Sequence, residues 1–481
     1  MLDLIISGGQ VVAPGVTAVL DIGVQDGLIA CVAAPGTLPA EATRTIRADG
    51  KIVVPGGVEP HAHIAEPMYS GWTSGEELWL QSPEGATRAA IFGGTTTVVS
   101  FAFMNVHTRT ATFDANEAVR DRIAVFDGHA YADFAFHPVV TGQPTAETLA
   151  SVGQAIDDGT TSIKVFTTDV TTGQGGVKID TGSLLDLMRV IAEHGGVLAV
   201  HAEDDELVKY QEAKLAREGQ DQWYHLHLVH TSLSEDLAFR KVLRLAREAG
   251  TGVYFMHVTG TSGVAAIAEA QAHGQAVYGE VLHNYLCFTA DDYQRPDGSK
   301  YQTYPALKTD TDRQALWEGL ANGTLSTVAT DEYTTSYQVK TQGRTIATAC
   351  GGHAGIETRG IIAFSEGYTR GRLSLERFVE VFATNPARIL GLYPRKGIIA
   401  PGSDADLAIW DPAVKKSIQL TDLHHDSDYS IWEGWQVQGW PVITILRGKL
   451  MVEDGHLLGN PEDGQFVTRK LNRTGLAHTG A

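Results

Sequence analysis

Eight short apolar segments alternate with longer segments of helical periodicity between about residues 56 and 390. The apolar segments show little polar alternation, as is typical of parallel strands buried on both faces of a sheet. They are KIVVPGGVEPHAH, GTTTVVSFAF, YADFAFHP, TSIKVFTT, GVLAVHAE, GVYFMHVT, QAVYGEVL and LSTVATDE. Eight strands that alternate with helices match a (β/α)8 TIM barrel, so we predict an α/β fold in which residues 56–390 form this barrel.

Two of the intervening segments consist of good helix formers. SLLDLMRVIAEHG precedes the fifth apolar segment, and SEDLAFRKVLRLAREAG precedes the sixth. The second of them closes with a Gly, which favours the backbone conformation that ends a helix. We therefore predict a helix before each of these two strands.

The two ends of the chain resemble each other more than they resemble the middle. Residues 1–55 and 391–460 both contain short apolar runs punctuated by Gly and Pro, a pattern of strands and turns. We predict that the two ends form one small β-sandwich beside the barrel. The Gly-rich, polar tail of residues 461–481 is assigned no structure.

The charge of the chain restricts its partners. There are 37 Lys and Arg against 57 Asp and Glu, which gives a net charge of −20 at pH 7. Nucleic-acid binding requires a basic surface, so we expect no nucleic-acid partner. No stretch of 18 apolar residues occurs, and the start of the chain carries Asp3 where a signal peptide would carry positive charge. We therefore expect a cytoplasmic protein without membrane contact.

The three cysteines, Cys31, Cys287 and Cys350, lie far apart and form no CxxC motif. This spacing argues against a disulfide framework and against a thiolate metal site. Any metal ion would have to be bound by nitrogen and oxygen ligands.

The pair His61 and His63 is informative only because of its position. Roughly 0.7 HxH pairs are expected by chance in a chain with 18 histidines among 481 residues. This pair, however, ends the first predicted barrel strand, where residues two apart point to the same side. Barrel active sites are built at that end of the strands. The alternative is a pair of solvated loop histidines.

Four further strands also end with residues that can bind metal. Taken singly, the histidines could be core residues and the lysine a surface residue. A lysine buried in SIKVF needs a partner, and a lysine carbamate, which bridges two cations, is one solution. Together the set suits zinc or a similar divalent ion. These four residues are Lys164, His201, His257 and Asp331.

These residues and the motifs around them resemble the amidohydrolase superfamily, and within it the hydantoinases, dihydropyrimidinases, allantoinases and dihydroorotases. The resemblance covers nearly the whole chain, and its last two motifs point to the hydantoinase and dihydropyrimidinase branch. The motifs are VVPGGVEPHAH, AAIFGGTTTVVSF, SIKVF, VLAVHAEDDE, FMHVTGTSGV, QAVYGE, ALWEGL, the aspartate of VATDE, ATNPARILGLYPRKGIIAPGSDADLAIWDP and EGWQVQGWPVITILRGK.

The resemblance implies two divalent metal ions, most often Zn, with Mn or Co as alternatives. One ion would be bound by His61, His63 and Asp331, and the other by His201 and His257. Lys164, as N6-carboxylysine, and a hydroxide would bridge the two ions.

The implied reaction is the opening of a cyclic amide or ureide by this hydroxide. Asp331 would take the proton of the attacking water and return it to the leaving nitrogen. A purely structural ligand is the alternative for Asp331. The resemblance also implies a homotetramer, with the tail GQFVTRKLNRTG reaching onto a neighbouring subunit.

The pocket residues depart from the family pattern at several positions, and we predict that these positions bind substrate. Asp169 replaces a tyrosine that donates to the oxyanion, and Tyr304 in YQTYPALK replaces a serine, so Tyr304 could supply that donor. The predicted substrate-binding residues are Tyr304, Asp169, Glu66, His283, Glu332 and Gly351. Acidic residues among them favour an NH-rich or cationic substrate and make plain 5-substituted hydantoins poor ones. The alternative is drift of surface loops.

Three functions therefore remain open. The first is a binuclear hydrolase that opens a hydantoin- or dihydropyrimidine-like ring. The second uses the same machinery on another amide, a lactam or a heteroaromatic C–N bond, in a cationic or NH-rich molecule. The third is a scaffold protein without activity. The presence of ligand-type residues at all six positions argues against it. A panel of these small-molecule substrates, assayed with Zn, Mn and Co, distinguishes them.

Overall fold

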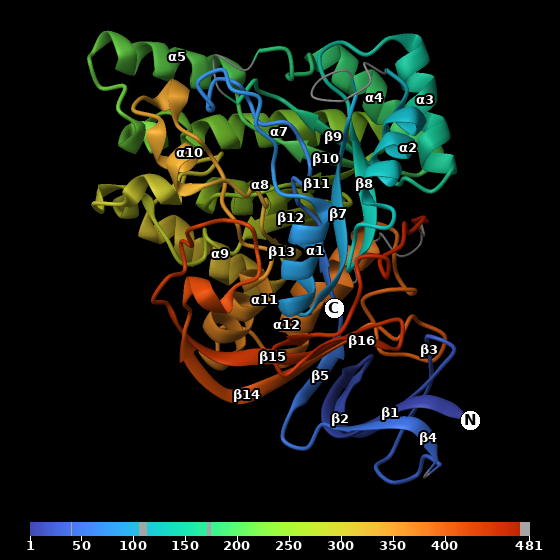
Figure 1. The fold of residues 1–481 in the computed structure, drawn as a ribbon. Coiled ribbons are helices and arrows are strands. Elements are labelled where there is room, and N and C mark those ends of the chain that lie inside the picture. The colour runs from blue at the N-terminus through green and yellow to red at the C-terminus, as the bar shows by residue number, and fades with distance from the viewer. Residues whose placement is uncertain (40, 105–112, 171–174, 472–481) are drawn as a thin grey trace.

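The computed structural model describes residues 1–39, 41–104, 113–170 and 175–471 (Figure 1). Eight parallel strands follow one another around a barrel in the order of the sequence. Its first and last strands meet just beyond their ends, where Ala62 pairs in parallel with Glu332. The predicted TIM barrel is therefore confirmed. The strands are β6 (Gly57–Glu59), β7 (Thr95–Phe103), β8 (Asp133–Val139), β9 (Ser162–Phe166), β10 (Val197–His201), β11 (Gly252–Phe255), β12 (Val277–Leu282) and β13 (Thr327–Ala329).

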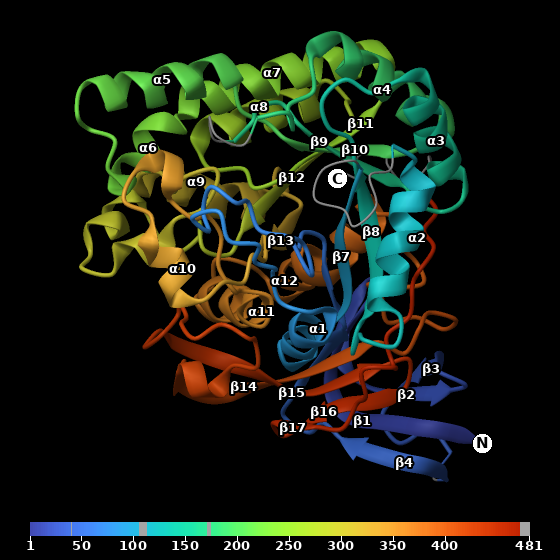
Figure 2. The same cartoon turned by 45° about the horizontal axis from the view of Figure 1, so that its top comes forward.

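Helices surround the barrel (Figure 2). The two predicted helices are present as α4 and α7, and each ends at a glycine in the left-handed conformation, Gly195 with φ 75° and Gly250 with φ 73°. None of the described helices is long and apolar enough to cross a membrane. The helices are α1 (Pro83–Phe92), α2 (Ala115–Phe126), α3 (Ala146–Asp157), α4 (Thr181–His194), α5 (Asp205–Arg217), α6 (Leu226–Val229), α7 (Ser232–Ala249), α8 (Thr261–Ala272), α9 (Asp310–Asn322), α10 (Tyr337–Gln342), α11 (Thr358–Ile362), α12 (Leu375–Val379) and α13 (Asn385–Ile389).

Alternation along the barrel strands decides which side chains point inward. In β10, Leu198 and Val200 pack in the same apolar cluster as the helices, whereas Ala199 belongs to the cluster inside the barrel. In β9, Ile163 and Val165 belong to the helix-facing cluster. Because successive side chains of a strand point to opposite faces, Lys164 of β9 points into the barrel.

Both chain ends build one nine-stranded mixed sheet, which lies below the barrel in Figure 1. Strand β5 of the N-terminal part pairs antiparallel with β14 of the C-terminal part, and the two parts share one apolar core. The predicted union of the two ends is confirmed. The strands are β1 (Leu2–Ala13), β2 (Val16–Gln25), β3 (Leu28–Ala33), β4 (Ala42–Arg47), β5 (Ile52–Pro55), β14 (Leu407–Ser417), β15 (Gln436–Leu446), β16 (Lys449–Glu453) and β17 (His456–Leu457). The domain limits at residues 55, 390 and 460 stay a prediction.

A buried lysine joins the barrel to this sheet. Lys396 Nζ lies 2.6 Å from a carboxylate oxygen of Asp133 at the start of β8, and 2.8 Å and 2.6 Å from those of Asp404 and Asp406. Burial lowers its pKa, but these three carboxylates outweigh burial and raise it above its ordinary value. The three acids are thus partners of a lysine that fastens the two parts of the fold.

The described part of the tail packs on its own chain. Phe466 pairs in parallel with Phe134 of β8, and the buried Arg469 donates to Ser162 Oγ at 2.7 Å. Through Leu471 the tail lies along its own barrel, where its backbone and side chains find partners. Its predicted contact with a neighbouring subunit stays a prediction. The remaining residues 472–475 of that motif lie outside the described residues.

Candidate metal centre

The structure brings the six candidate metal ligands into one pocket. All of them lie in or just beyond the C-terminal ends of barrel strands, from which their side chains converge on the barrel axis. Other residues of the pocket are mostly aromatic. The six ligand candidates in the pocket lining are His61, His63, Lys164, His201, His257 and Asp331.

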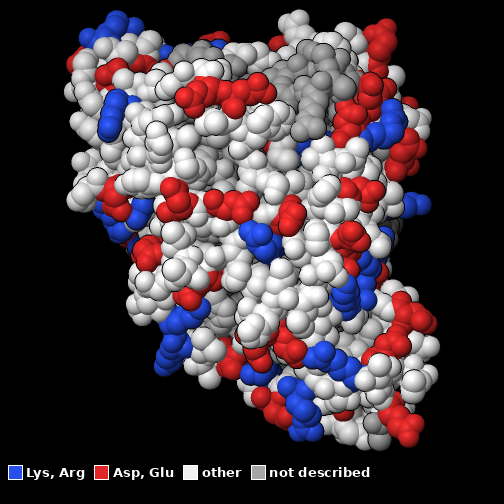
Figure 3. Space-filling model, viewed as in Figure 1, with Lys and Arg blue, Asp and Glu red and all other residues white. Residues whose placement is uncertain are grey.

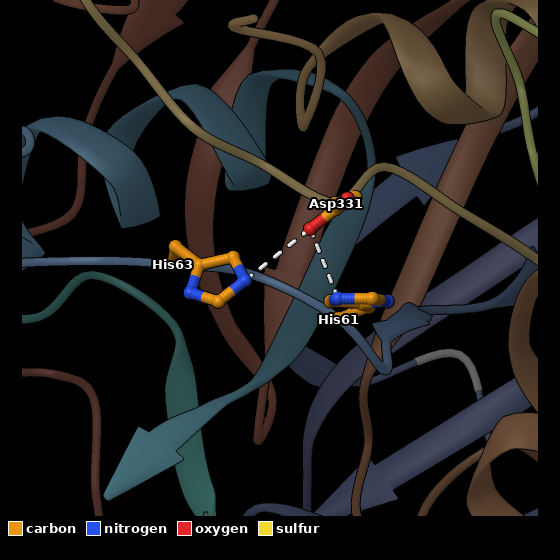
Figure 4. Close-up of side chains that lie close together, drawn as sticks. All are labelled: His61, His63 and Asp331. Atoms are coloured by element: carbon orange, nitrogen blue, oxygen red, sulfur yellow. Dashed lines mark ion pairs between the residues drawn. The ribbon is translucent and has the colours of Figure 1, made fainter. Parts of the chain in front are cut away.

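Three of these residues form a compact group (Figure 4). Asp331 Oδ1 lies 2.9 Å from His61 Nε2 and 3.3 Å from His63 Nε2, and the three potential ligand atoms lie within 4.8 Å of one another. Burial would raise the pKa of Asp331, but the two histidines outweigh burial and hold it well below its ordinary value. Two imidazole nitrogens and an ionised carboxylate fit a divalent ion such as zinc.

His201 and His257 form a second group, with ring centroids 4.4 Å apart. Burial lowers the pKa of both histidines, which favours the neutral imidazole that binds metal. His257 and Asp331 both adopt the left-handed backbone conformation, with φ 42° and 51°. Such conformations are costly for residues other than Gly and cluster at functional sites.

Lys164 lies between these groups, almost completely buried. Its Nζ is 2.9 Å from Met256 Sδ and 4.6 Å from the centroid of the Phe166 ring. In the described part of the chain no carboxylate lies within ion-pair distance of it, and burial lowers its pKa to about 8. The neutral amine is the form that adds CO2 to become a carbamate. The donor set therefore fits a carboxylated lysine.

Three of the histidine rings are each held by a carboxylate that contacts one ring nitrogen. Glu280 Oε1 lies 2.7 Å from His61 Nδ1, and Glu203 Oε2 lies 2.9 Å from His201 Nε2. Glu66, which we expected to contact substrate, has Oε2 2.8 Å from His63 Nδ1. Sequence reasoning missed Glu203 and Glu280. Two features of the sequence could have identified them: Glu203 follows the strand-end His201 by two residues, and Glu280 is a charged residue inside the apolar run VYGEVL.

Aromatic rings form the wall of the pocket, and two glycines make room for them. A Cβ on Gly351 would lie 2.2 Å from Tyr304 Cδ2, and one on Gly352, at φ 74°, would lie 2.4 Å from Tyr333 Cβ. Gly351, predicted to bind substrate, thus shapes the wall. The aromatic lining residues are Tyr69, Trp72, Phe103, Phe166, Tyr304 and Tyr333.

Tyr304 differs from its predicted role. Its ring lines the pocket and stacks on Trp72 at 5.5 Å, but its hydroxyl donates to the backbone oxygens of Ala349 at 3.0 Å and Ile346 at 3.3 Å. A phenol has one hydrogen, so this arrangement leaves none for an oxyanion. Tyr333, two residues after Asp331, is a lining phenol that we did not predict.

Asp169 fastens a loop and does not line the pocket. Its Oδ1 accepts hydrogen bonds from the backbone N–H groups of Gly176, Val177 and Lys178 at 3.0 to 3.2 Å, and Oδ2 pairs with Lys209 at 2.8 Å. These bonds hold the pKa of Asp169 below its ordinary value despite its burial. The neighbouring Val170 and Val177 line the pocket in its place.

His283 and Glu332 also lie outside the pocket lining, contrary to our expectation. His283 is fully buried, with Nε2 3.2 Å from Thr358 Oγ1. Glu332 accepts from the backbone N–H groups of Gly355 at 2.6 Å and Ile356 at 2.7 Å. Glu332 also accepts from Gln81 Nε2 at 2.8 Å, so its carboxylate is used within the surrounding protein and not in the pocket.

The chain is similar to known proteins over nearly its whole length. A model of the amidohydrolase family matches residues 52–451. The D-hydantoinase of Rhizobium radiobacter is 34% identical over 477 residues, 98% of this chain and 99% of that protein. The L-hydantoinase of Paenarthrobacter aurescens is 31% identical over 473 residues, again 98% and 99%. The crystal structure of dihydropyrimidinase from Brevibacillus agri has a TM-score of 0.90 at 28% identity and covers 98% of this chain and 99% of that one.

Proposed function

Because the chain belongs to the amidohydrolase family, we propose that it hydrolyses a cyclic amide or ureide of the hydantoin or dihydropyrimidine type. The observation that carries this proposal is the convergence of six ligand-type side chains in one aromatic pocket. Similarity over the whole chain to proteins named D-hydantoinase, L-hydantoinase and dihydropyrimidinase supports the ring class.

Two divalent metal ions would be bound at this site, one by His61, His63 and Asp331 and the other by His201 and His257. Lys164, as N6-carboxylysine, would bind both. Zinc suits these nitrogen and oxygen donors, and Mn or Co are alternatives. When bound, the ions lower the pKa of water and polarise the amide carbonyl.

The side chains of this chain move the proton and hold the ring. Asp331 is ionised at neutral pH because His61 and His63 depress its pKa. It accepts a proton from the attacking water and passes it to the leaving nitrogen, so that the ring amide becomes an acid and an N–H group. The aromatic wall packs against the substrate and excludes bulk water.

The pocket wall also indicates which kind of substituent the ring of the substrate carries. Of the three acids that were expected to attract a cationic substrate, Asp169 and Glu332 lie outside the lining, and Glu66, which lines the pocket, is paired with His63. Valines and aromatic rings form much of the remaining wall. An apolar lining gains most from an apolar or aromatic substituent. We therefore propose substrates with such a substituent over cationic ones, the reverse of the expectation from the sequence.

The experiment that tests the function is a panel of hydantoins, dihydropyrimidines, allantoin, lactams and cationic amides. We expect protein purified without chelator to contain close to two divalent ions per chain and to open a hydantoin or dihydropyrimidine ring. Chelation should abolish the activity, and Zn, Mn or Co should restore it. Metal-loaded protein that opens none of these rings but cleaves a lactam or a cationic amide would replace our proposal by the alternative.

We also propose a homotetramer, as the sequence resemblance implies. Apolar side chains on neighbouring helices support an interface: Tyr210 of α5 is 59% exposed, and Leu233 and Leu237 of α7 are 57% and 44% exposed. Light scattering should give four times the mass of 51.6 kDa, and a monomer mass would refute this. Acidic and basic side chains are interspersed on the face of the protein that Figure 3 shows. The cytoplasmic location is a separate point and stays a prediction.

A further inference from the structure

We propose that Glu66 is a positioning residue that tunes only one of the two metal sites, by holding His63 so that Nε2 faces the site. The inference rests on the proposed function, because it concerns the metal ion bound by His61, His63 and Asp331. Glu66 Oε2 lies 2.8 Å from His63 Nδ1, and both side chains are largely buried.

The packing around His63 does not decide which of the two ring nitrogens faces the metal site, and only a hydrogen bond can decide this. The ring stacks on Phe101, with centroids 4.4 Å apart and an angle of 26° between the planes, and Tyr333 meets it edge-on at 5.8 Å. Such packing fixes the plane of an imidazole but hardly distinguishes it from the ring turned over by 180°. An acceptor on Nδ1 makes this distinction, because it fixes both the tautomer and the nitrogen that faces Asp331.

The loop that carries Glu66 is built to return it to His63. Ala65, in the loop that follows β6, adopts the left-handed conformation with φ 49°, which turns the chain back just before Glu66. Arg122 holds this turn by donating to the backbone oxygen of Ala65 at 2.8 Å and to that of Ile64. The backbone oxygen of Glu66 accepts from Leu80 N at 2.9 Å. Glu66 is thus fixed from both sides of the turn.

The other two carboxylates show what is particular to Glu66. Glu280 and Glu203 come from barrel strands or their ends and hold His61 and His201. Glu66 alone of the three comes from a loop, and it also lines the pocket. A carboxylate on the outer nitrogen makes the inner nitrogen a better metal ligand, so Glu66 should strengthen the site of His63 and leave the site of His201 and His257 unchanged.

The test is the affinity of each metal ion, measured by chelator competition with metal analysis on the full-length protein. In Glu66→Met, which keeps the length of the side chain, we expect one of the two ions to bind about 10- to 100-fold more weakly. Glu66→Gln keeps an acceptor oxygen without the charge and should fall between. Glu203→Gln is the matched control, and it should weaken the other ion.

A double mutant separates positioning from a general structural effect. In the His63→Ala background, Glu66→Met should cause no further loss of affinity, since there is no ring left to hold. An equal loss in both backgrounds, or two unchanged affinities in Glu66→Met, would overturn the inference alone. Wild-type protein that binds no divalent ion would overturn the proposed function, and this inference with it.

Discussion

Replacing Lys164 by alanine is expected to remove most of the bound metal and to lower the rate of ring opening by at least about a thousandfold. The side chain is buried inside the barrel, between the two histidine groups, and no carboxylate of the described residues pairs with it. A buried ammonium without a partner is costly, whereas a carbamate at this point would carry the negative charge that two cations require. Metal analysis and initial rates on the same preparation measure both effects.

Small acids and a second substitution make this result interpretable. Formate, acetate or propionate should restore part of the metal content and activity of Lys164→Ala, because each can enter the space left by the side chain and supply two oxygens. Lys164→Met preserves the packing against Phe166 but leaves no such space, so it should not be rescued. Activity close to wild type in either variant would show that a carboxylated lysine is not required.

The second large effect is expected for Asp331→Asn, which should lower kcat by about 10²- to 10⁴-fold while KM changes little. Asparagine keeps an oxygen within reach of His61 and His63, but it cannot accept a proton at neutral pH. Metal content should therefore fall much less than the rate. Steady-state kinetics and metal analysis across the neutral pH range give the comparison.

The neighbouring acid provides the control for this experiment. Glu332 is buried and bonded to the backbone of Gly355 and Ile356, and it lies outside the pocket lining. Glu332→Gln should lower the melting temperature and leave kcat close to that of the wild type. If Asp331→Asn lost its metal in proportion to its activity, Asp331 would be a structural ligand and another group would transfer the proton.

The candidate metal ligands could be predicted because their positions follow from the period of a strand. His61, Lys164 and His201 lie in or just beyond parallel strands whose ends meet on one face of a barrel. Once the eight apolar segments are assigned, the alternation of side chains determines which residues point inward. His257 does not follow this alternation, since Tyr254 and Met256 already belong to the cluster inside the barrel. His257 and Asp331 lie two residues beyond their strands in left-handed conformations, with φ 42° and 51°, so their direction into the pocket was decided by the tertiary structure.

The substrate wall could not be predicted in this way, because loops have no such period. Asp169 was assigned to the pocket because it replaces a tyrosine of the resembled family, but its carboxylate turns back to three backbone N–H groups of its own loop. Tyr304 does reach the pocket, yet its hydroxyl bonds to the carbonyl of Ala349, 45 residues away. Which polar group satisfies a buried partner depends on segments that meet only in the folded chain.

By itself the sequence determined the barrel, the union of the two chain ends and the residues able to bind metal, because each follows from local periodicity and from the chemistry of side chains. Only the tertiary structure decided what surrounds them. The carboxylates Glu66, Glu203 and Glu280 acquire their partners through a loop turn or through neighbouring strands. A buried hydrogen bond forms only when the donor and acceptor arrive at the right distance and angle, and no period of the sequence encodes that geometry.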